Sequence, residues 1–503
     1  MSLTSLGFFV FLLVTFLLYY ICPRLQKYTL LAASLVFYFS AAGTAGGRLP
    51  ILICYILAVT YVGALLLEKY NKEDRKRNAV LLISVSALVA ALFVLKYAYN
   101  LGNLLLSILR ADRDISWLQF VSVMGMSYFT LSAIGYLFDV SWASYKAERN
   151  LGTVALFLFY FPTVVSGPVV RFHEMREQYL ERHFPSYDDV SLGLGRMVWG
   201  YFKKLVISDR FGLVVSGVYG NYQDHGSLDI VIATLCYAVQ LYTDFSGCMD
   251  IVLGASRLFG IRLPENFDAP FFSRTVQEFW QRWHITLGVW FKDYVMYPIQ
   301  KSKPMVRLGK KAKKRLGKKV GKKVPFYLSM VVLWFLIGIW HGGTGYYFMA
   351  SAAIPFLWLM GGDFAQPFFA KLRERCGVRD GAVFRLLQRA RTLLLICVCW
   401  VFVCAAGTGE GFQVLKQILT QPFVCRIGEV AGVGSLGKKT LLIFLLTLLL
   451  AAAEYILRER DSSLRQFLEN RKLPARVAFV YAELLMILFL GMVGSSAFIY
   501  FQF

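Results

Sequence analysis

Apolar runs of membrane-crossing length recur through the whole chain, and they constrain its fold more than any other feature. The sequence is 57% hydrophobic and only 17% charged, and a soluble chain of 503 residues could not cover its surface with so few charges. A helix needs about 20 apolar residues to cross a bilayer. We therefore predict an all-α, polytopic integral membrane protein with roughly 11–13 membrane helices.

The candidate spans are Leu6–Ile21, Tyr28–Ala42, Leu49–Leu67, Ala79–Tyr97, Phe120–Val140, Leu151–Val165, Leu192–Tyr219, Leu228–Phe259, Phe326–Trp340, Tyr346–Met360, Thr392–Ala406, Thr440–Ile456 and Val477–Tyr500. The first run lacks a basic leader and a small-residue cleavage site, so we expect a span and not a signal peptide. Basic loops mark the cytoplasmic side. This rule places both termini outside and His341 near the outer end of its span.

About half of the net charge of +23 lies in one segment. Lys301–Lys323 holds 12 Lys and Arg residues and no acidic residue, between two apolar segments. We predict a cytoplasmic loop that follows the positive-inside rule, and no binding of nucleic acid. Anionic lipid headgroups, an acidic carrier protein or the phosphates of coenzyme A are the partners that such a loop could contact.

The middle third of the chain carries proline, glycine and carboxylates within apolar stretches. The three clearest places are Phe161–Pro168, Thr243–Gly247 and Pro264–Phe267. Irregular backbone at membrane depth persists only where protein or a water-filled cavity surrounds it. We predict broken or re-entrant helices here, lining a cavity.

The apolar residues of Val276–Val295 have helical spacing, which predicts one helix with a single apolar face. Glu278 and Arg282 are four residues apart and should pair on the opposite face. Ser273 is the expected N-terminal cap, and Asp293 falls on the last turn.

Two of the five histidines follow a tryptophan, as Trp283-His284 and Trp340-His341. Histidine is the side chain best suited to proton transfer near neutral pH, and ionisable groups in membranes are usually functional. The alternative is structural, with each histidine bonded locally at the end of an apolar segment. No spacing typical of a metal site accompanies them.

Buried carboxylates in the run Leu228–Phe259 need partners. Asp244 and Asp250 flank Ser246, and a structural ion pair is the simplest role for them. The candidate partners are Arg257, Arg282, Lys203 and Lys204.

These motifs together resemble the membrane-bound O-acyltransferase family, in particular its bacterial alginate O-acetyltransferase and D-alanyl-teichoic-acid transfer types. The motifs that carry the resemblance are Pro264–Ser273, Glu278–His284, Trp290 with Asp293-Tyr294, Gly125–Thr130, Phe161–Pro168, Trp199–Lys204 and Asp244–Gly247. The chain departs from the family pattern at Cys248-Met249, at Lys292 and after Pro298, which bears on the substrate more than on the chemistry.

The resemblance implies a funnel of helices with a thin central tunnel. It implies one domain over 1–503, with N-terminal spans at 1–119, a catalytic core at 120–345 and C-terminal spans at 346–503. In this family a cytosolic thioester, from acetyl-coenzyme A or an acylated carrier protein, supplies the acyl group. The acceptor is an extracytoplasmic hydroxyl, often reached through a partner protein, and no bound cofactor or metal is expected.

The resemblance maps the family histidines onto His341, as general base, and His284. We expect substrate or tunnel contacts from Trp283, Arg282, Asp293, Glu265, Asn266, Asp244, Ser246 and Trp340. The expected function is acyl transfer, most simply of acetyl, to a cell-envelope polysaccharide at the plasma membrane. D-alanyl transfer to teichoic acid, a polymer or lipid transporter, and a non-catalytic scaffold are the alternatives.

Overall fold

The structure is a computed structural model that describes residues 1–41, 49–111, 113–115, 125–424, 437–492, 494 and 498–499. The chain divides into two compact units. Unit 1 comprises Met1–Gly200, Cys248–Pro264 and Ala497–Phe503, and unit 2 comprises Tyr201–Gly247 and Glu265–Ser496. The expected division at residues 119–120 and the expected span ends Ala42, Phe120 and Tyr500 lie outside the described residues.

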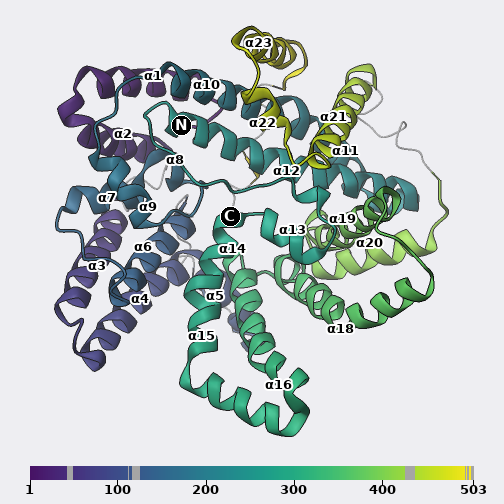
Figure 1. The fold of residues 1–503 in the computed structure, drawn as a ribbon, viewed down its shortest axis with the longest axis horizontal. Coiled ribbons are helices and arrows are strands. Elements are labelled where there is room, and N and C mark those ends of the chain that lie inside the picture. Colours follow the sequence, from purple (N-terminus) through teal and green to yellow (C-terminus); the bar gives the residue numbers. More distant parts are fainter. Residues whose placement is uncertain are drawn as a thin grey trace. The chain divides into compact units, whose positions relative to one another are not determined.

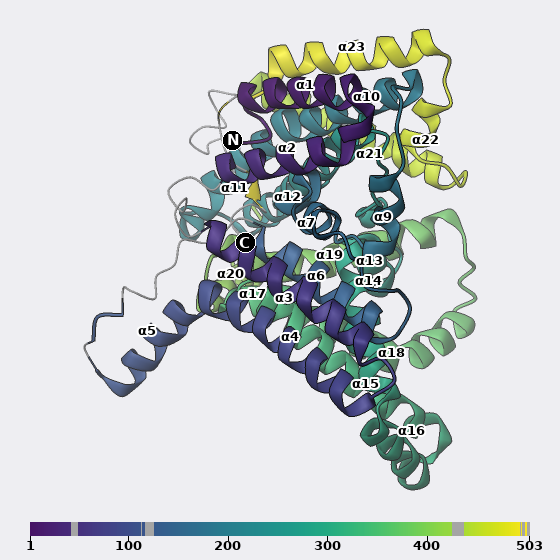
Figure 2. The same ribbon diagram turned by 90° about the vertical axis from the view of Figure 1, so that its left-hand side faces the viewer.

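Unit 1 is helical throughout its described part (Figures 1 and 2). Its helices are α1 Leu6–Ile21, η1 Pro23–Leu25, α2 Gln26–Ala41, α3 Leu49–Lys69, α4 Asp74–Lys96, α5 Ala98–Leu109, α6 Met126–Ser141, α7 Leu151–Phe159, α8 Phe161–Val164, α9 Phe172–Leu180 and α10 Tyr187–Tyr201, together with the end of α12. Helix α6 is buried along nearly its whole length and packs against α3 and α4. This packing forms the centre of the unit.

Unit 2 is also helical wherever the structure describes it. Its helices are η4 Phe202–Ser208, α11 Asp209–Tyr219, η5 Tyr222–Asp224, α12 Ser227–Arg257 (as far as Gly247), η6 Pro270–Phe272, α13 Val276–Arg282, α14 Ile285–Phe291, η7 Lys292–Met296, α15 Tyr297–Lys301, α16 Lys303–Trp340, α17 Gly345–Phe348, η8 Met349–Ala353, α18 Ile354–Arg375, α19 Ala382–Cys404, α20 Thr408–Thr420, α21 Gly437–Arg458, α22 Leu464–Glu469 and α23 Leu473–Leu490. Three of them, η4, η7 and η8, are π-helices, which occur frequently at functional sites.

Eight helices of the described part are long and apolar enough to cross a membrane, so the predicted all-α, multi-pass membrane fold is confirmed. These are α3, α4, α12, α16, the run Gly345–Arg375, α19, α21 and α23. Helix α1 and the helix that follows it form a ninth candidate, bent by 108°. Some other expected spans are divided into shorter helices. The expected span Leu151–Val165 is divided at Tyr160 into α7, which ends at Phe159, and α8, which has Pro162 near its start.

The predicted helix breaks are present in two places and absent in a third. Residues 160–171 include only the four-residue α8, and residues 258–269 contain no helix longer than a turn. The predicted break at Thr243–Gly247 is wrong, because α12 is continuous through it. A lysine that neutralises Asp244 from the neighbouring π-helix makes a break at the carboxylate unnecessary.

The basic segment 301–323 is helical except at Ser302 and Gly317, whereas the cytoplasmic side predicted for it stays a prediction. Helix α16 folds back at Gly317, whose φ of 78° interrupts the helical backbone. Gly321 then packs against Lys313, and Gly309 packs against Pro325. The segment is a hairpin of two antiparallel helical arms, and its second arm continues directly into the apolar run that ends at Trp340.

Two glycines share the same positive φ of 78° but differ in their surroundings. A Cβ at Gly125 would lie 1.8 Å from the carbonyl oxygen of Val164, whereas a Cβ at Gly317 would meet nothing within 4 Å. Gly317→Ala should lower the free energy of unfolding by about 1–2 kcal/mol, the cost of left-handed backbone. Gly125→Ala should cost more, since backbone must also move. Thermal unfolding of purified protein in detergent checks the order, and equal midpoints for the two variants would contradict it.

Candidate active site

The chain turns sharply at His284, between two short helices of unit 2. Helix α13 ends at Arg282, α14 begins at Ile285, and His284 has the left-handed backbone angles φ 49° and ψ 50°. The prediction of one helix over Val276–Val295 is therefore wrong. The predicted cap is also wrong, since the side chain of Thr275, not that of Ser273, accepts a bond from the amide of Glu278. Strained backbone of this kind is concentrated at functional sites.

Asn266 compensates for the helix break. The backbone oxygen of Asn266 accepts a hydrogen bond from the amide of Ile285 at 3.0 Å. Its side-chain Oδ1 accepts from the amide of Thr286 at 3.1 Å and from the Thr286 hydroxyl at 2.9 Å. The amide of Asp268 in turn bonds the carbonyl of Arg282 at 3.0 Å. The segment 266–268 thus runs along the break and accepts or donates the bonds that a continuous helix would have made.

The same Asn266 oxygen fixes the protonation pattern of the His284 ring. A backbone amide can only donate, so its bond from Thr286 identifies the Asn266 atom as oxygen and not nitrogen. His284 Nδ1 lies 3.3 Å from this oxygen and must be the donor. Burial lowers the pKa of His284 well below its usual value, and the nearby His341 lowers it further. A neutral ring protonated on Nδ1 carries its lone pair on Nε2.

The Trp340 ring contacts both His284 and His341. Its ring centroid is 6.0 Å from that of His284 and 4.9 Å from that of His341, with edge-on geometry at both contacts. His341 caps the end of α16, where its amide bonds the carbonyl of Ile337 at 3.1 Å. His284 is 4% exposed, whereas His341 is half-buried. The structure therefore brings both predicted histidines to one aromatic ring.

Trp283 packs in an aromatic cluster. Its ring stacks on Phe279 at 5.5 Å and meets Phe267 and Trp400 edge-on or tilted at 5.1 and 5.5 Å. The residues on either side of the helix break thus have different roles. Trp283 anchors the break in the core, which leaves His284 to face Phe245 and Trp340.

A buried ion cluster holds α12 at Asp244, directly before a residue that touches His284. Lys204 Nζ is 2.8 Å from carboxylate oxygens of both Asp209 and Asp244, and all three side chains are at most 4% exposed. This confirms Lys204 as a partner of Asp244. Between Asp244 and Ser246, the ring of Phe245 meets the His284 ring edge-on at 4.9 Å. The ion cluster therefore fixes the register of α12 against the imidazole.

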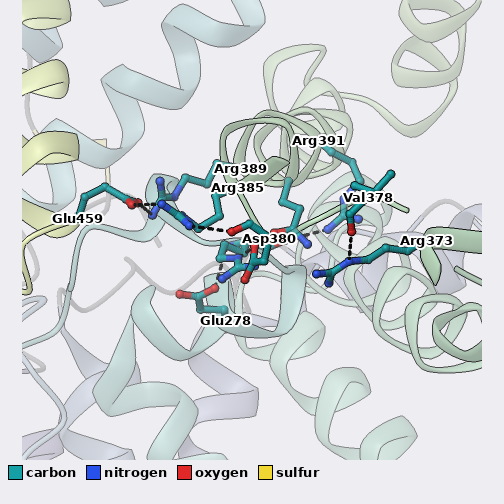
Figure 3. A network of polar contacts seen from close by, with 10 residues as sticks. Glu278, Arg373, Val378, Asp380, Arg385, Arg389, Arg391 and Glu459 are labelled. Atoms are coloured by element: carbon teal, nitrogen blue, oxygen red, sulfur yellow. Dashed lines mark hydrogen bonds and ion pairs between the residues drawn. The ribbon is translucent and has the colours of Figure 1, made fainter. Parts of the chain in front are cut away.

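Arginines and carboxylates tie the segment before α13 to α19 (Figure 3). The guanidinium of Arg274 bonds Asp380 at 2.8 Å, and its backbone amide bonds Glu278 at 2.8 Å. Arg391 of α19 donates to the backbone oxygen of Arg274 at 2.8 Å. In the same view Arg385 and Arg389 pair with Glu459. This network holds the N-terminal end of α13 in place.

The remaining predicted residues lie in separate contacts. The predicted pair of Arg282 with Glu278 is present at 2.8 Å. Glu265 pairs with Arg465, and Asp293 is half-buried in the π-helix η7. In unit 1, Asp250 pairs with Arg196 at 2.9 Å, a partner that was not among the four predicted, and Arg257 pairs instead with Asp189.

Sequence reasoning missed Thr286 and Phe245, which touch Asn266 and His284. Thr286 follows His284 by two residues, a spacing that in the predicted helix would place it on a different face. Only the positive φ at His284 brings both residues to the same oxygen, and no local sequence pattern indicates that angle.

Comparison with known proteins identifies the family of the chain. The family model of the membrane-bound O-acyltransferases matches residues 52–408. The chain belongs to this family. As a member of the membrane-bound O-acyltransferases it is an O-acyltransferase of the membrane, and the helix break at His284 and the end of α16 at His341 both lie within the matched region.

Several relatives modify polymers of the cell envelope. The chain is 28% identical over 400 residues to a probable alginate O-acetylase of Pseudomonas syringae pv. tomato, covering 78% of this chain and 70% of the relative. It is 29% identical over 464 residues to a peptidoglycan O-acetyltransferase of Helicobacter pylori, covering 85% and 82%. A teichoic acid D-alanyltransferase of Streptococcus thermophilus is 31% identical over 235 residues, covering 45% and 54%.

Asn266→Ala should reduce acyl transfer about tenfold or more, because the His284 ring loses the acceptor that orients it. Thr286→Val is the matched control, since it removes a second hydrogen bond to the same oxygen and leaves the imidazole bond in place. The control should retain activity within about threefold, the effect expected for one neutral hydrogen bond. Initial rates at matched protein levels measure both, and equal losses would contradict the role of Asn266.

Proposed function

We propose that this enzyme moves an acyl group, most simply acetyl, from a cytosolic thioester to a hydroxyl of an extracytoplasmic cell-envelope polysaccharide at the plasma membrane. The observation that carries the proposal is the pair of imidazoles that contact one tryptophan ring, Trp340, with one imidazole buried and held in a single tautomer. Acyl transfer from a thioester needs a base for the hydroxyl proton and does not need a nucleophilic side chain.

In the proposed mechanism His341 is the general base. The acceptor hydroxyl oxygen attacks the thioester carbonyl while a nitrogen of His341 takes its proton. The tetrahedral intermediate then collapses, the carbon–sulfur bond breaks, and the proton passes from His341 to the departing thiolate. The products are an ester and a free thiol. The half-buried position of His341 supports this role, because the base must reach a substrate.

His284 is proposed as an acceptor on the thiol side of the reaction. Because its Nδ1–H donates a hydrogen bond to Asn266, its Nε2 carries a lone pair and can accept a hydrogen bond. It is therefore suited to hold a thiol or hydroxyl proton and not to stabilise an oxyanion by donation. Backbone amides near the helix breaks are the proposed oxyanion donors.

Acetyl transfer is the favoured reaction, because the alginate and peptidoglycan O-acetylating relatives described above align over 78% and 85% of the chain, and the D-alanyl relative aligns over 45%. The proposed donor is acetyl-coenzyme A, with an acylated carrier protein as the second candidate. An extracytoplasmic partner protein is proposed to complete delivery to the polymer. D-alanyl transfer is distinguished by supplying proteoliposomes with labelled acetyl or labelled D-alanyl thioesters and following label into the polymer fraction.

His341→Gln should reduce transfer by about a hundredfold or more, the usual contribution of a general base. His225→Gln is a matched control, since His225 is a partly exposed histidine of the same unit that faces Asp229. The control should retain wild-type transfer. Full transfer by the His341 variant at a normal protein level would refute the proposed base, and transport of polymer that survives the substitution would support the transporter instead.

A further inference from the structure

The basic hairpin of unit 2, residues 303–323, has no role in the proposed reaction. All of its lysines and arginines are exposed, and the segment contains no acidic residue. The hairpin also exposes apolar side chains among the charges, including Val306, Leu316 and Val320 at 45%, 55% and 52%. A surface with this mixture of cationic and apolar groups needs a partner that is both anionic and apolar.

The length of the second arm fixes how far the charges can lie from the bilayer. The apolar run of α16 begins at Phe326, and the helix from Lys318 to Phe326 is about 12 Å long at 1.5 Å per residue. A headgroup layer of about 5–8 Å lies on each side of the hydrocarbon core. The charges of the second arm therefore begin at the headgroup layer and extend no more than about 12 Å from the apolar run.

The fold of the hairpin keeps the first arm at the same depth. Gly321 packs against the backbone of Ala312 and Lys313, and Gly309 packs against the ring of Pro325. The first arm therefore runs back along the second toward the membrane. Lys323, on the second arm, is also bonded to Asp363 of α18. The charges of both arms are thus held beside the end of a membrane span.

We propose that the basic hairpin is a docking surface for the anionic headgroups of the cytoplasmic leaflet. Its lysines and arginines contact lipid phosphates, and Val306, Leu316 and Val320 enter the acyl boundary. Two observations favour lipid headgroups: the charges lie close to the membrane span, and apolar side chains are exposed among them. A soluble acidic carrier protein or free coenzyme A would instead need charges that extend into the cytosol. The inference does not depend on the proposed reaction.

The test is lysine labelling of the full-length protein in nanodiscs of phosphatidylcholine, with or without a quarter of phosphatidylglycerol. A sulfonated, amine-reactive ester reports accessibility, and mass spectrometry quantifies each lysine. Labelling of Lys318 and Lys319 should fall about threefold or more in the anionic discs, and the difference should vanish at about 1 M salt, where the Debye length is about 3 Å. Lys371, an exposed lysine of α18, should change less.

Two double variants provide matched controls. Lys310→Gln with Lys311→Gln should reduce the protection of Lys318 and Lys319. Lys438→Gln with Lys439→Gln, an exposed adjacent pair on the predicted outer side, should leave that protection intact. Equal labelling in the two kinds of disc would overturn the proposal. Protection by an acidic carrier protein in discs of phosphatidylcholine alone, without any effect of phosphatidylglycerol, would also overturn it and assign the hairpin to a protein partner.

Discussion

The candidate site depends on one acceptor, the amide oxygen of Asn266. Three donors meet at this oxygen, two from Thr286 and one from the His284 ring. The bonds from Thr286 replace helical bonds that are lost where the chain turns at His284. The bond from the His284 ring to the same oxygen orients the imidazole. A left-handed residue costs about 1–2 kcal/mol, so the turn persists only because the surrounding structure supports it.

The rest of unit 2 supports this arrangement from three sides. The aromatic cluster around Trp283 anchors the break, the Lys204 ion cluster sets the register of α12, and Trp340 contacts both histidines. A buried ion pair contributes little to stability by itself, but it strongly opposes any shift that would leave one of its charges alone. The site is therefore positioned by contacts that tolerate little displacement.

Sequence predicted most of the helices and two of the three proposed breaks, but it missed the turn at His284 and the hairpin of the basic segment, for physical reasons. The length of an apolar run determines whether it can cross a membrane, and this length can be read from the sequence. The range of α1 and the end of α16 at Trp340 therefore match the predictions. The turn at His284 could not be predicted from the sequence, because the apolar residues on both sides of it keep helical spacing. The high charge of the basic segment gave no indication of a packed hairpin. Its two charged arms can nevertheless pack closely, because Gly309 and Gly321 have no side chain at the contact. The candidate histidines could be predicted from the sequence. Thr286 could not, because only the turn at His284 in the folded structure brings it to Asn266.

The central claim is that His284 is a neutral ring protonated on Nδ1, with the lone pair on Nε2. Nitrogen NMR of protein labelled at histidine, with His284 assigned by comparison with a His284→Gln variant, tests it most directly. At neutral pH the account predicts a protonated Nδ1 signal and an unprotonated Nε2 signal, and Asn266→Ala should mix the two tautomers. A signal from a doubly protonated ring, or from a ring protonated on Nε2, would contradict it.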